Sequence, residues 1–140
     1  MERRDHLLRQ IEALGRILSR LRELITGGAT AEAQVQLQDE MKTLGLDLST
    51  ASAVNAGTLR MLLGGPVLDA RKAFAVGALL HLDAMRARAD GDEVRANRSA
   101  SNALALLREA RPQLDGERAA MADEIILSFR PEPRRGAVEE

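Results

Sequence analysis

Histidine is the side chain best suited to acid–base chemistry and metal binding near neutral pH, and the 140-residue chain contains only two. His81 falls in a predicted helix over 67–89, and Asp83 follows it by two residues. Residues two apart on a helix point in different directions, so this pair is neither a catalytic dyad nor a pair of metal ligands. We interpret His81 as a histidine packed in the core or at an interface. His6 is interpreted as a solvated one.

Three carboxylates cluster at Asp90, Asp92 and Glu93, and clusters of carboxylates can bind calcium. A calcium loop also needs a closing bidentate glutamate at a fixed distance, which this segment lacks. Asp92 is better interpreted as the N-cap of the helix that follows it, with Glu93 in the first turn. We therefore predict no metal ion and no other cofactor.

The sequence offers no other catalytic constellation. Cysteine is absent, so the chain has no disulfide and no thiolate site. No serine stands in a nucleophile-elbow setting, and the Gly–Gly pairs lack the Lys–Ser/Thr of a phosphate-binding loop. We predict a protein that is not an enzyme and has no catalytic residues. One alternative stays open, a small-ligand carrier with a pocket near His81 and Asn97, between the predicted helices over 67–89 and 92–112.

Charge and hydropathy narrow the range of partners. A formal net charge of −1 argues against nucleic acid or an anionic membrane as the main partner, and bases would have few aromatic side chains to stack on. No apolar run approaches the length of a bilayer span, and the N-terminus lacks the pattern of a secretory signal. We predict a cytoplasmic protein with no nucleic-acid or membrane partner.

The elements that carry these residues are predicted to be helices. Leucine, alanine and arginine dominate, β-branched residues are sparse, and no segment alternates apolar and polar residues over strand length. The expected fold is all-α with five to seven helices in one domain over 1–130. The N-terminal helices occupy 1–65 and a second group occupies 66–130, while the tail over 131–140 is predicted to be disordered. The helix that starts the second group, over 67–89, is expected to bury one apolar side. Thr30 is the predicted N-cap of the second helix.

The opening helix, from near Glu2 to Gly27, carries the clearest pattern. Its apolar residues recur at alternating spacings of four and three, a heptad repeat that we call the seam: Leu7, Ile11, Leu14, Leu18 and Leu21. Leu8, Ile17 and Leu24 widen this stripe beyond what a two-stranded coiled coil needs. We predict that one side of the stripe packs on the domain and the other on a second copy, giving a homodimer.

Residues 73–110 resemble a tetratricopeptide repeat, a helix–turn–helix unit that stacks into scaffolds for protein partners. The turn at Gly91-Asp92 and the small residues Ala96, Ala100 and Ala103 carry the likeness. Asp83 departs from it, because the repeat places an aliphatic residue there. The resemblance implies that the long opening helix packs on an antiparallel helical array.

The whole chain is also similar to a family of small bacterial helical proteins of uncharacterised function, which opens with a pattern like the segment from Leu8 to Leu18. This likeness implies a fold and no catalytic residues. Together these patterns predict a non-catalytic interaction module that forms a homodimer and can hold a protein partner.

Overall fold

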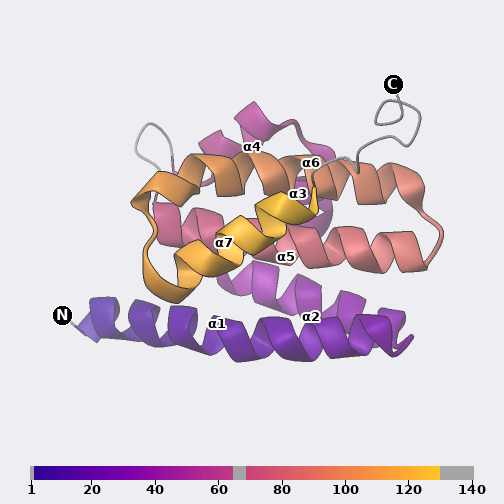
Figure 1. The fold of residues 1–140 in the computed structure, drawn as a ribbon, viewed down its shortest axis with the longest axis horizontal. Helices are drawn as coiled ribbons and strands as arrows, with labels where there is room; N and C mark the ends of the chain where they lie inside the picture. Colours follow the sequence, from indigo (N-terminus) through magenta and orange to yellow (C-terminus); the bar gives the residue numbers. More distant parts are fainter. Residues whose placement is uncertain (1, 65–68, 130–140) are drawn as a thin grey trace, which may run out of the picture.

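The computed structural model of the protein describes residues 2–64 and 69–129, with side chains described from residue 13 onward. The elements, shown in Figure 1, are α1 (Glu2–Thr26), α2 (Thr30–Thr43), α3 (Leu48–Ala53), α4 (Ala56–Leu62), α5 (Ala70–Ala89), α6 (Glu93–Ala110), a 3-10 turn η1 (Arg111–Gln113) and α7 (Gly116–Ser128). The all-α prediction is confirmed, since these ranges hold seven α-helices and no strand. The predicted tail over 131–140 lies outside the described residues.

Helix α5 is the centre of the fold. It packs antiparallel against α6, and it also contacts α1, α2, α3 and α7 (Figure 1). Its buried residues occur on every side of the helix, from Ala70 to Ala87, and they include the charged side chains of Asp83 and Arg86. The expectation of one apolar side on this helix is therefore wrong, because neighbours cover α5 all round. An antiparallel pair is common in all-α folds, so the repeat resemblance stays a prediction.

Glycine at position 77 lets α5 and α6 approach closely. A Cβ atom at Gly77 would lie 2.8 Å from Leu107 Cγ and 3.4 Å from the carbonyl oxygen of Ala103. The contact with Leu107 is too short for van der Waals packing, so any side chain here must push Leu107 away, with α6 close behind it. Gly77 therefore sets the spacing of the central helix pair.

We expect Gly77→Ala to lower the free energy of unfolding by about 1–2 kcal/mol, because overpacking outweighs the better helix propensity of alanine. Gly15→Ala is the matched control, since a Cβ at this helical glycine meets nothing within 4 Å. The control should be neutral or stabilising by up to about 1 kcal/mol. Urea denaturation measures both, and equal stability of Gly77→Ala and the native protein would contradict the steric argument.

The segment between α2 and α5 folds as two short helices with side-chain caps. Asp47 accepts a hydrogen bond from the amide of Thr50 at the start of α3, and Asn55 accepts one from the amide of Thr58 at the start of α4. The predicted N-cap of α2 is wrong: Thr30 is already helical, and Ala29 occupies the cap position without a side-chain bond. The predicted cap at Asp92 is present, and its Oδ1 accepts a hydrogen bond from the amide of Arg95.

Candidate functional site

The described part of the seam is buried in the protein's own core. The exposed fractions are 5% for Leu14, 7% for Leu18 and 0% for Leu21, because this side of α1 packs on α2 and α5. The side chains of Leu7 and Ile11 lie outside the described residues. A second copy could use Leu14, Leu18 and Leu21 only by opening this core, so self-association through the whole seam is not supported by their burial.

His81 is packed, as the sequence predicts, on the side of α5 that faces α1 and α7. Its ring meets the ring of Phe129 edge to face, with 5.4 Å between centroids and 85° between planes. Its Nδ1 atom is buried and has no hydrogen-bond partner among the described residues. Burial, together with the positive charges of Arg22 and Arg88, lowers the pKa of His81 to about 4. The imidazole is therefore neutral at pH 7.

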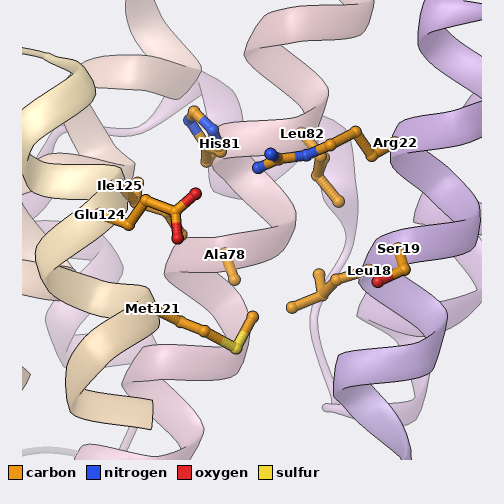
Figure 2. A pocket seen from close by; sticks show the side chains of 9 residues that line it. All are labelled: Leu18, Ser19, Arg22, Ala78, His81, Leu82, Met121, Glu124 and Ile125. Carbon is orange, nitrogen blue, oxygen red and sulfur yellow. The ribbon is translucent and has the colours of Figure 1, made fainter. Parts of the chain in front are cut away.

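A cavity of about 170 Å³ opens beside His81, between α1, α5 and α7. Figure 2 shows the side chains that line it: Leu18, Ser19 and Arg22 from α1, Ala78, His81 and Leu82 from α5, and Met121, Glu124 and Ile125 from α7. The aliphatic members form its apolar surface. The polar members are Ser19, Arg22, His81 and Glu124, so the cavity combines a neutral imidazole with one cation and one anion.

Arg22 and Glu124 extend toward the same space from opposite walls. In Figure 2 the guanidinium of Arg22 reaches from α1 toward His81, and the carboxylate of Glu124 reaches from α7. Neither side chain forms an ion pair within the described ranges, with each other or with another residue. The cavity therefore presents two opposite charges, on exposed side chains, that no described side chain pairs with.

Asn97 does not belong to this cavity. Its side chain is exposed on α6, where its Oδ1 accepts a hydrogen bond of 3.5 Å from Arg88 Nη2. The structure thus separates the two residues predicted to share a pocket. The space beside His81 lies between α1, α5 and α7, whereas the predicted pocket was between the two helices of the central pair.

Asp83 is fully buried and holds three elements together. Its oxygens accept hydrogen bonds from Arg86 Nη2 at 3.1 Å, Arg95 Nε at 3.0 Å and Ser99 Oγ at 2.7 Å. Ser99 Oγ also lies 2.7 Å from Ser52 Oγ on α3. Both oxygens of Asp83 are engaged, and Arg86 also pairs with Asp90 at 2.8 Å, so this cluster is a structural network joining α3, α5 and α6.

The network explains why position 83 departs from the repeat pattern. An aliphatic residue there would remove one of the two carboxylates that Arg86 contacts and leave Asp90 as the other, although the side chain of Arg86 is only 6% exposed. The spacing of Asp83, Arg86 and Asp90 is a local signal of helical ion pairs. The partners on α3 and α6 are distant in sequence and give no such signal.

The described residues contain no group of three or more histidine and carboxylate side chains arranged to hold a metal ion. No helix in the described ranges is both long and apolar enough to cross a bilayer.

Sequence reasoning missed Ser19, Arg22 and Glu124 as members of a site. They come from helices about 100 residues apart in the chain, and nothing in the local pattern of either helix links them. Comparisons with protein-family models, with curated proteins and with solved structures found no match. Both family resemblances therefore remain predictions.

Proposed function

We propose that the protein is a non-catalytic helical interaction module that forms a homodimer through the N-terminal half of α1. The observation that carries this proposal is the mismatch between α1 and what it packs on. Leu14, Leu18 and Leu21 are buried by α2 and α5, while α1 begins at Glu2, three turns earlier. In Figure 1 its first turns extend past the ends of α5, α6 and α7.

The sequence of these first turns continues the seam. Leu7 and Ile11 keep the heptad spacing of Leu14 and Leu18, so the same apolar repeat runs through the N-terminal turns of α1. Two copies that pair these turns would remove apolar surface from water, with Arg3, Arg4 and Arg9 at the edges selecting register. The proposed interface therefore includes only Leu7 and Ile11 of the five seam residues.

The charged groups of the interior support a non-catalytic role. The buried carboxylate of Asp83 is saturated by structural hydrogen bonds, and His81 is kept neutral by its surroundings. A protein partner on the α5–α6 pair and a cytoplasmic location belong to the same proposal, and both depend on the sequence patterns alone.

Ile11→Glu tests the proposed interface. We expect the native protein to have the mass of a dimer at micromolar concentration, and the variant to dissociate at least about tenfold more readily, because a charge is costly inside an apolar interface. Analytical ultracentrifugation measures both. Leu14→Glu is unsuitable, because Leu14 is buried within the protomer and the change would unfold it.

Arg20→Glu is the control, since Arg20 is exposed on the same helix. This variant should dimerise like the native protein, with the same helical circular dichroism as Ile11→Glu. A monomeric native protein at micromolar concentration would refute the proposal. So would an Ile11→Glu variant that is folded and still fully dimeric.

A further inference from the structure

The cavity between α1, α5 and α7 is lined by apolar side chains and by two residues of opposite charge, Arg22 and Glu124. Leu18, Ala78, Leu82 and Ile125 are buried and form the wall, and half-buried Met121 completes it. Burying apolar ligand atoms against such a wall is favourable in proportion to the area removed from water. This part of the cavity therefore suits a small aliphatic group.

The charges restrict the ligand further. Arg22 and Glu124 line the same cavity from opposite walls and have no ion-pair partner within the described ranges (Figure 2). A simple anion would be attracted by Arg22 and repelled by Glu124. A simple amine would be attracted by Glu124 and repelled by Arg22. A molecule that carries both a carboxylate and an ammonium group is attracted by both walls.

The volume sets the size of that molecule. A protein cavity of about 150 Å³ accommodates benzene, which has six carbon atoms. By the same scale a cavity of about 170 Å³ holds about seven non-hydrogen atoms. An α-amino acid with a short aliphatic side chain, such as valine, has nearly this size, and its charged atoms can extend toward the exposed side chains of Arg22 and Glu124.

We propose that this cavity binds a small aliphatic α-amino acid, with the carboxylate on Arg22, the ammonium group on Glu124 and the side chain against Leu18 and Leu82. Ser19 and the unpartnered Nδ1 of His81 supply further hydrogen-bonding capacity at the same site. The proposal does not depend on dimerisation, because Leu7 and Ile11 do not line the cavity.

A titration of the full chain with L-valine, followed by amide NMR, tests the ligand class. We expect saturable shifts centred on the residues that line the cavity. Isovalerate, which lacks the amine, and isobutylamine, which lacks the carboxylate, should each bind at least about tenfold more weakly, because each leaves one charge unmatched. Absence of saturable shifts with valine at millimolar concentration would overturn the proposal, as would isovalerate binding as tightly as valine.

Variants of the two charged residues test the site. Arg22→Gln and Glu124→Gln should each weaken valine binding at least about tenfold, and both side chains are exposed, so the fold is expected to persist. Arg20→Gln, a neutral change at an exposed arginine outside the cavity, should bind valine like the native chain. Unchanged affinity in either cavity variant would show that the charges do not recognise the ligand and would refute the assignment.

Discussion

Asp83→Ala should lower the free energy of unfolding by about 3–5 kcal/mol, because it removes the shared partner of two arginines. Asp83 is 0% exposed and Arg86 nearly as buried, so water cannot replace the lost carboxylate. Ser99 would lose its 2.7 Å hydrogen bond as well, which weakens the attachment of α3 through Ser52. Chemical denaturation followed by circular dichroism measures the loss.

The matched control is Asp123→Ala. Asp123 also pairs with an arginine, Arg111, but its side chain is 50% exposed. Ion pairs in contact with water contribute about 0–1 kcal/mol, so this variant should remain close to the native stability. If Asp83→Ala cost no more than Asp123→Ala, the buried network would not hold α3, α5 and α6 together as described.

The native protein should lose stability between pH 6.5 and pH 4 through His81. The pKa of an unfolded histidine is about 6.5, whereas burial and the charges of Arg22 and Arg88 lower the pKa of folded His81 to about 4. In this window the unfolded chain binds the proton and the folded one does not, so acid favours unfolding. The contribution of neutral His81 to the free energy of unfolding is fully present above pH 6.5. At about 1.4 kcal/mol per pKa unit, its loss reaches at most about 3 kcal/mol at pH 4.

His81→Leu isolates this effect, because leucine can pack on Phe129 but cannot titrate. The stability of this variant should change little between pH 7 and pH 5, while the native protein loses about 2 kcal/mol over the same range. The carboxylates of Asp47 and Asp123 have pKa values lowered by hydrogen bonds, so their losses come at more acidic pH. Parallel stability curves for the two proteins would mean that the pKa of His81 is the same in the folded and unfolded states.

Much of the fold follows from local patterns in the sequence. Three signals act within a few residues and predict where helices begin and end: the heptad spacing of α1, the glycines after it, and the aspartate cap of α6. The all-round burial of α5 could not be predicted in the same way. Its alanines blur the contrast between buried and exposed sides, and the extent of burial depends on how many other helices surround it.

The candidate site was less predictable than the fold. His81 stood out as one of two histidines, but its neighbours Arg22 and Glu124 come from α1 and α7, and only the packing of both helices on α5 brings them together. Asn97 was predicted to share a pocket with His81, but α6 carries it to an exposed surface. Asp83 departs from the repeat pattern, and the sequence does not show why, because its hydrogen-bond partner Ser99 lies on another helix. Ser99 in turn contacts Ser52, which lies 47 residues earlier in the chain.

The central position of α5 also constrains how the chain can come apart. Helix α5 contacts five other helices: α1, α2, α3, α6 and α7. Helix α4 contacts α6, so removing any one helix would expose part of the shared core. A backbone cut between α4 and α5 would leave one fragment, 1–64, deprived of its main packing surface. Such fragments should be unstructured when separated and regain helicity only when mixed, as in a complementation pair that behaves as a single cooperative unit.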